Sequence, residues 1–177
     1  MYLISAYFDS TTTKQLKRII DTLAVQTGND YMTENEVPPH LTISSFETRN
    51  PENLKEAFFK LENEAAVPVR IISAGVFLPY VMYAAPVLNI ELQHLSQRIY
   101  DVFSEREDVT INKCYRPYSW FPHITLGKKL DEQQMRTAFE VVQRHFAPLK
   151  GEIVRLGMAK TNPHMDLCEI QLQAYET

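Results

Sequence analysis

The chain has 177 residues, with 18 Lys plus Arg against 22 Asp plus Glu. This length suits one globular domain, or two small lobes that share a core, and we expect a single domain over residues 1–177. Hydrophobic residues at 45% and charged residues at 23% exclude a disordered chain. The net charge of −4 disfavours non-specific binding to nucleic acid, but it is compatible with a local basic site.

The cysteine content and the N-terminus point to a cytoplasmic protein. Cys114 and Cys168 cannot form a disulfide framework, and no Cys-x-x-Cys pair indicates zinc, so we expect both to be buried packing residues. The first residues carry no basic group before Asp9, so they do not have the pattern of a signal peptide. We expect a reduced, monomeric protein.

One uncharged stretch, at 71–90, approaches the roughly 20 residues that a membrane span needs. It contains Gly75, Pro79 and Pro86, and it is rich in Val, Phe and Tyr, which favours strands. We therefore predict a strand, a turn near Pro79–Tyr80 and a second strand, and no contact with a membrane.

The remaining patterns alternate between strands and helices. In chain order they predict a strand at 2–8, a helix from 9 to 28, a strand around 41–43, a helix from 50 to 61, the hairpin at 71–90, a helix at 92–103, an extended aromatic segment at 115–126, a helix at 131–146, and strands at 153–158 and 167–172 joined by a turn at 162–163. The strand–helix–strand–helix order recurs, so we expect an α+β fold with an internal duplication.

A short pattern occurs twice, as Pro-His-apolar-Thr-apolar at 39–43 and again at 122–126. Side chains alternate along a strand, so His40 and Thr42 should share one face while Leu41 faces the core. The same argument puts His123 and Thr125 on one face. If the two halves are related by a two-fold axis, these faces would meet across a groove.

Such a groove has the groups that displacement at phosphorus requires. With ordinary pKa values near 6.5, one imidazole can act as a base and the other as an acid at neutral pH. The threonine hydroxyls can donate hydrogen bonds to the non-bridging phosphate oxygens. No carboxylate cluster suited to magnesium is evident, so we expect neither a metal nor another cofactor.

The paired His-apolar-Thr-apolar strands resemble the signature of the 2H phosphoesterase superfamily, also called the 2′–5′ RNA ligase-like or RNA 2′,3′-cyclic phosphodiesterase family. The resemblance implies a bilobal fold in which antiparallel sheets flank a central groove and helices lie outside. It also implies metal-independent opening of 2′,3′-cyclic phosphates on RNA ends or small nucleotides. By the motif match, His40 and His123 are the catalytic pair, and Thr42 and Thr125 bind phosphate.

The chain departs from the family pattern at two places. Members often carry a basic residue just after the first motif, where this chain has Ser44 and Ser45. The second motif often continues to an arginine, and Lys128 stands there, which keeps the charge but loses the bidentate geometry. We expect Lys128 to bind phosphate, and both departures leave the particular substrate open.

Other interpretations of the histidines remain. Either motif alone could be a strand with a surface histidine, and His40 and His123 could bind a metal, although the residue two positions later is threonine rather than a ligand. A cysteine nucleophile paired with His123 is conceivable, but the spacing does not favour it. The other histidines are interpreted as structural or solvated: His94, His145 and His164.

The segment at 110–130 is basic and aromatic in an otherwise acidic chain, and it lacks Asp and Glu. Basic side chains beside aromatic ones suit a phosphate and a stacked base. Tyr118 and Trp120 are the better stacking candidates, and Arg116 is a further substrate-binding candidate. Alternatively, Trp120 belongs to the core and the lysines are solvated.

Three functions follow from these observations. The first is a phosphoesterase that opens a cyclic phosphate on an RNA end or small nucleotide. The second is a 2′–5′ RNA ligase or phosphodiesterase that uses the same residues. The third is a non-catalytic protein that binds RNA or nucleotides in the same groove.

Overall fold

The computed structural model describes residues 1–161 and 165–174, so the expected turn at 162–163 and His164 lie outside the described residues. Its strands form one eight-stranded antiparallel sheet in the order β5-β2-β1-β7-β3-β4-β6, with β8 also paired to β7. The expected α+β fold is confirmed.

The sheet has two halves, each named here by the histidine that it carries. The His40 half contains β1 (Tyr2–Phe8), β2 (His40–Thr48), β5 (Val109–Ile111) and β8 (Met165–Gln171). The His123 half contains β3 (Val67–Phe77), β4 (Val81–Pro86) and β6 (Ile124–Gly127). The hairpin of β3 and β4 confirms the strand–turn–strand interpretation of the uncharged stretch, and its second strand ends earlier than predicted.

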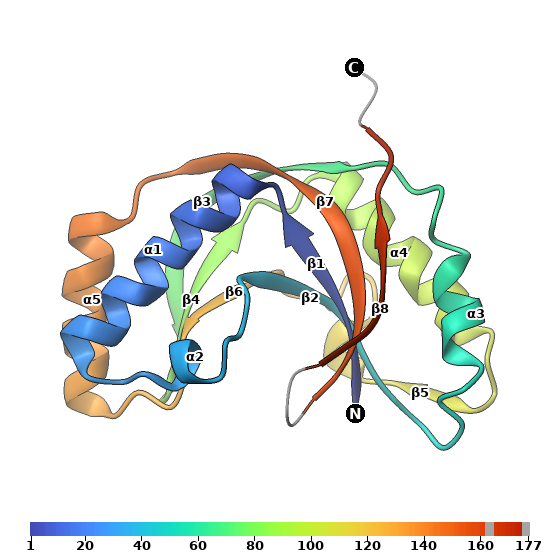
Figure 1. Cartoon of the computed structure of the whole chain (residues 1–177), viewed down its shortest axis with the longest axis horizontal. Helices are drawn as coiled ribbons and strands as arrows, with labels where there is room; N and C mark the ends of the chain where they lie inside the picture. The colour runs from blue at the N-terminus through green and yellow to red at the C-terminus, as the bar shows by residue number, and fades with distance from the viewer. Residues whose placement is uncertain (162–164, 175–177) are drawn as a thin grey trace.

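Strand β7 (Leu149–Lys160) belongs to both halves, because different parts of it have different neighbours. Residues 149–153 pair with β3, whereas residues 153–160 pair with β1. Figure 1 shows this strand, in orange, running across the molecule between the two groups of helices. The separate sheets expected from the duplication are therefore joined into one.

The long helices exchange sides between the halves. Helix α1 (Ser10–Thr27) follows β1 but packs beside α5 (Glu132–His145), near β6. Helix α4 (Ile90–Ser104) follows β4 and contacts β3, but it also packs on β2 and β5 of the other half, next to α3 (Leu54–Phe59). Figure 1 shows α1 and α5 on one flank and α3 and α4 on the other. Each half of the sheet is thus covered by a helix that follows a strand of the other half.

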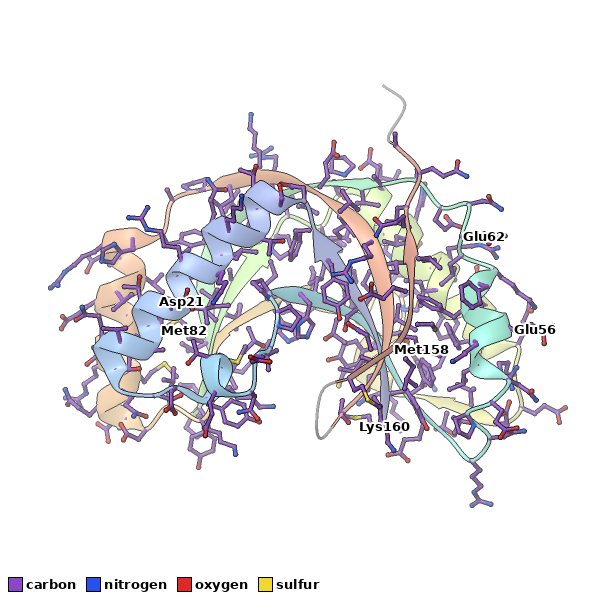
Figure 2. All side chains as sticks on the ribbon, in the orientation of Figure 1. Asp21, Glu56, Glu62, Met82, Met158 and Lys160 are labelled. Atoms are coloured by element: carbon purple, nitrogen blue, oxygen red, sulfur yellow. The ribbon has the colours of Figure 1, made fainter. Side chains whose placement is uncertain are left out.

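Apolar side chains from helices and strands form the core of both halves. Figure 2 labels one buried methionine on each side, Met82 of β4 and Met158 of β7, whereas Glu56 and Glu62 lie at the outer edge near α3. In the His40 half, the ring of Phe46 stacks on that of Phe103 of α4, with ring centres 4.7 Å apart. Burial of such apolar surface is the main favourable term in folding.

Local signals explain where the long helices begin and end. The Asp9 carboxylate accepts hydrogen bonds from the first backbone N–H groups of α1, and Gly28 ends that helix in the left-handed region with φ 68°. Asp131 and Gln134 form a capping box at the start of α5. The elements that sequence reasoning missed are short: α2 (Tyr31–Glu34), β5 and the 3-10 helix η1 (Lys113–Tyr115).

Candidate functional site

The two repeated motifs open onto the same cavity, which has a volume of about 440 Å³. It is lined by the predicted catalytic and phosphate-binding residues His40, Thr42, His123, Thr125 and Lys128. The strands β2 and β6 that carry the motifs come from opposite halves of the sheet. The structure thus brings these side chains together, and their chemical roles remain predictions.

Both imidazoles are oriented by a backbone carbonyl two residues earlier. His40 Nδ1 lies 2.8 Å from the carbonyl oxygen of Pro38, and His123 Nδ1 lies 2.9 Å from that of Phe121. A carbonyl oxygen only accepts hydrogen bonds, so Nδ1 must carry the proton in the neutral ring. Nε2 is then the nitrogen that can take up or release a proton.

Strand β2 contains a bulge that changes which serine faces the cavity. Thr42 pairs with Ser5 and Ser44 pairs with Ile4, so Ile43 has no partner of its own on β1. An extra residue reverses the alternation beyond it. Ser45 therefore lines the cavity with Thr42, whereas simple alternation would place Ser44 there.

The duplication extends to the strands beside each motif. In the His40 half, Thr42 pairs with Ser5, which pairs with Gly157 on β7. In the His123 half, Thr125 pairs with Tyr83, which pairs with Gly75 on β3. Both glycines therefore occupy the same register position relative to the motif.

The glycines leave room for tyrosine rings. A Cβ atom added at Gly157 would lie 2.7 Å from Cε2 of Tyr7, and one at Gly75 would lie 2.6 Å from Oη of Tyr83. Because such approaches are closer than real Cβ contacts, a larger residue would displace a ring beside a motif histidine.

His123 lies among aromatic rings. Its ring centre is 4.7 Å from that of Phe77, 5.9 Å from that of Tyr83 and 6.3 Å from that of Phe121. Burial among these rings disfavours the charged imidazolium and lowers the pKa of His123 below its ordinary 6.5, against the opposing effect of the Phe121 carbonyl. His123 is therefore held toward its neutral form.

His40 has a polar neighbourhood. Its ring centre is 6.3 Å from that of Tyr7, which is buried and donates its hydroxyl to both carboxylate oxygens of Asp166 at 2.8 Å. The Arg155 guanidinium lies 4.2 Å from the centre of the Tyr7 ring and also pairs with Glu169. Burial and the Asp166 carboxylate both raise the pKa of the Tyr7 phenol, so it stays protonated as a donor.

The prediction that Trp120 stacks on a base is wrong. Its side chain is only 6% exposed, and its indole Nε1 donates to the carbonyl oxygen of Thr42 at 3.1 Å. Trp120 instead ties the approach to the second motif to the strand of the first. Tyr118 is 87% exposed and Arg116 is exposed, and neither lines the cavity, so their contact with a substrate remains a prediction.

Sequence reasoning missed several residues that line the cavity. Tyr31 and Asn35 come from the α2 segment, and Asn112 and Tyr115 lie around η1. Burial raises the pKa of the Tyr115 phenol above its ordinary 10.0, so it can donate a hydrogen bond at neutral pH. The basic-aromatic composition at 110–130 could have pointed to Tyr115, but no periodic pattern marks α2.

Tyr31 also organises the lysines after the second motif. Lys129 Nζ lies 4.4 Å from the centre of its ring and Lys128 Nζ lies 5.8 Å from it. These distances are typical of cation–π contacts. They hold two positive charges at the rim of the cavity, one of which, Lys128, lines it.

Among the described residues, the remaining histidines, the cysteines and the acidic side chains add no further candidate site. Within residues 1–161 and 165–174, no group of three or more His, Cys, Asp or Glu side chains could hold a metal ion together. His94 and His145 are exposed on helices. Cys168 is partly buried, but the prediction of a buried Cys114 is wrong, because that residue is exposed in η1. The described part of the chain has no helix with the length and apolar character of a membrane span.

Comparison with solved structures agrees with this fold. A phosphoesterase is 14% identical with a TM-score of 0.66, over 97% of each chain. TT0787 of Thermus thermophilus is 16% identical with a TM-score of 0.64, over 99% of each chain. LigT of E. coli, in its apo form, is 14% identical with a TM-score of 0.61, over 97% of this chain and 96% of that one.

At the level of sequence, no curated protein matches the chain. The family model of the 2′-5′ RNA ligase superfamily, in contrast, matches residues 17–164 and so includes both motifs. The protein with this cavity and these paired strands therefore belongs to the 2′-5′ RNA ligase superfamily.

Proposed function

We propose that the protein is a phosphoesterase that opens a 2′,3′-cyclic phosphate on an RNA end or small nucleotide. The observation that supports this most directly is the convergence of His40, Thr42, His123 and Thr125 on one cavity. Each imidazole is fixed by its Nδ1 contact, so that Nε2 is the reactive nitrogen. The substrate phosphorus would lie between the histidines, with the threonine hydroxyls on its non-bridging oxygens.

The reaction needs one proton acceptor and one proton donor. The base removes a proton from water as the water oxygen forms a bond to phosphorus. The bond from phosphorus to one ribose oxygen breaks, and that oxygen takes a proton from the acid. The product is a phosphomonoester beside a free hydroxyl, and the two histidines exchange protonation states during the turnover.

The surroundings of the histidines suggest how they divide these roles. His123 is held toward the neutral form by burial among aromatic rings, which suits the base. His40 then supplies the proton to the leaving oxygen. Lys128 attracts the anionic substrate to the rim, and the protonated Tyr115 offers a further hydrogen bond.

Relatives support a nucleotide substrate. LigT of E. coli, which shares the fold, has been crystallised with 3′-AMP and with phosphate. By this likeness we propose a ligand of the same class for this cavity. The family description also names 2′-5′ RNA ligation, which favours a second candidate reaction. In that reaction the same residues would join RNA ends, or cleave the joint, through a 2′–5′ linkage.

Turnover of nucleoside 2′,3′-cyclic monophosphates in the presence of EDTA tests this proposal. We expect a phosphomonoester product, and we expect turnover to survive the chelator because the proposed steps use only side chains. Activity that is lost with EDTA and restored by added zinc or magnesium would contradict the metal-free mechanism. A His40→Ala/His123→Ala double variant with the parent rate would show that the repeated motif is only part of the scaffold.

A further inference from the structure

Two aromatic side chains beside His123 remain exposed without a role in the mechanism. Phe77 is 40% exposed and Phe121 is 49% exposed, and neither lines the cavity that contains the motif threonines. Their ring centres are 5.8 Å apart with an interplanar angle of 77°, and both approach the His123 ring. They therefore form an aromatic surface on the rim, directly beyond the reactive histidine.

The position of this surface is unusual for apolar side chains. The core of the His123 half would offer such rings more burial than the rim does, and contiguous exposed apolar surface commonly marks a binding site. Every nucleobase has a flat apolar face, so stacking on aromatic rings tolerates any sequence. The rim beside a phosphate-handling histidine is therefore suited to a base.

The charges on the two sides of the cavity indicate on which side an RNA chain would bind. The loop after Phe77 is tied to the turn that carries the lysines, because the N–H of Leu130 donates to the carbonyl oxygen of Tyr80 at 3.0 Å. Lys128 and Lys129 thus stand on the side of Phe77 and Phe121. On the His40 side Arg155 pairs with Glu169, and the further carboxylate of Asp166 leaves this cluster with a net negative charge, which repels phosphates.

We propose that Phe77 and Phe121 are a stacking site for the base of the nucleotide next to the reactive one. The substrate is then an RNA end of at least two nucleotides, with its terminal nucleoside in the cavity and its penultimate base on the rim. This inference rests on the proposed function, since it places the reactive phosphate between the motif histidines. It narrows the substrate from small cyclic nucleotides to RNA ends.

The test compares a nucleoside 2′,3′-cyclic monophosphate with a trinucleotide that ends in the same cyclic phosphate. We expect the wild-type protein to have a kcat/KM about 5- to 100-fold higher for the trinucleotide, in the range of a single stacked base. Phe121→Ala and Phe77→Ala should reduce this ratio of kcat/KM values at least threefold. Phe121→Trp keeps an aromatic ring at this position and should keep the wild-type ratio. The ratio is the readout because both rings also touch His123, so absolute rates will change as well.

Two controls separate stacking from other effects. Phe139 is 50% exposed on α5, outside the cavity, so Phe139→Ala removes an equally exposed ring and should leave the ratio unchanged. A trinucleotide whose penultimate residue is abasic keeps its phosphates but lacks the base. This substrate should lose the higher kcat/KM of the trinucleotide. If the higher kcat/KM persists, it comes from charge alone, and the inference is overturned.

The inference and the proposed function fail in different ways. Turnover of the mononucleotide with a wild-type ratio near one would keep the phosphoesterase and overturn the stacking site. If neither substrate is turned over, the proposed function fails, and equilibrium binding of the labelled trinucleotide 3′-phosphate still decides the inference. Binding that Phe121→Ala and the abasic substitution leave unchanged would then overturn it.

Discussion

The two motif histidines share a backbone geometry and differ in what packs against their rings. Each ring donates a hydrogen bond from Nδ1 to the carbonyl oxygen two residues earlier. Each motif also has a glycine at the same register position two strands away. Beside His40, however, stands the hydrogen-bonded pair Tyr7–Asp166, whereas His123 lies against the rings of Phe77, Tyr83 and Phe121.

This difference shows that the repeated motif orients each ring but does not fix its surroundings. At His123 the surrounding aromatic rings bury the imidazole and lower its pKa, because burial disfavours the charged form. A duplicated strand can in this way provide an acid and a base from one motif. The following predictions test that separation.

The largest effect should come from removing either imidazole. His40→Ala and His123→Ala should each lower kcat by roughly 10²–10⁴-fold, as expected for the loss of a proton-transfer group. With a neutral His123 as base, His123→Ala should remove the acidic limb of the pH–rate profile, and His40→Ala the alkaline limb. Profiles with the limbs exchanged would reverse the assigned roles.

The register-equivalent glycines should differ in their effect on stability. A Cβ at position 157 meets the buried Tyr7 and its hydrogen-bond partner Asp166, so Gly157→Ala should cost about 2 kcal/mol, within the usual range for overpacking. A Cβ at position 75 meets the end of the half-buried Tyr83 side chain, which can swing aside, so Gly75→Ala should cost less. Urea unfolding measures both, and equal losses would contradict the asymmetry.

A smaller effect is expected at the cationic rim. Lys128→Ala should raise KM about fivefold with little change in kcat, because an exposed charge attracts the substrate without touching the reacting bonds. The effect should shrink at high salt, which screens such a charge. Lys14→Ala on α1 removes the same charge away from the cavity and is the matched control. If Lys14→Ala raises KM as much as Lys128→Ala does, the effect comes from the net charge of the protein and not from the position of Lys128.

The smallest expected change is in the shape of the pH profile. Phe77→Ala should let water reach His123 and raise its pKa toward 6.5, so the acidic limb of the pH–rate profile should move to higher pH. Phe77→Leu keeps apolar cover and should move the limb less. A limb that stays in place in Phe77→Ala would show that the aromatic surroundings do not control His123.

The long elements and the faces on which the motif residues lie could be predicted from the sequence, because both depend on local periodicity. Alternation along a strand is enough to place His40 beside Thr42 and His123 beside Thr125. The bulge at Ile43, which turns Ser45 rather than Ser44 toward the cavity, has no such local signal. It depends on pairing with β1, which lies far away in the sequence.

Trp120 shows the same limit for side chains. An aromatic residue before a motif strand is compatible with stacking on a base and with packing in a core. The choice is made by the carbonyl oxygen of Thr42, which is 78 residues away in the chain and accepts its indole N–H. The neighbours of the histidines, Tyr7 and Phe77, could not be predicted either, because they reach the site through cross-strand pairing.

The shared strand β7 also has a consequence for how the protein is made. On the ribosome, β1 emerges early, yet it stays without one of its neighbours until residues 153–160 have been synthesised. The same strand supplies Gly157, which accommodates the ring beside His40, and its residues 149–153 pair with β3. The nascent chain therefore cannot complete the surroundings of His40 before β7 has been synthesised, whereas the rings around His123 all come from residues that precede β7.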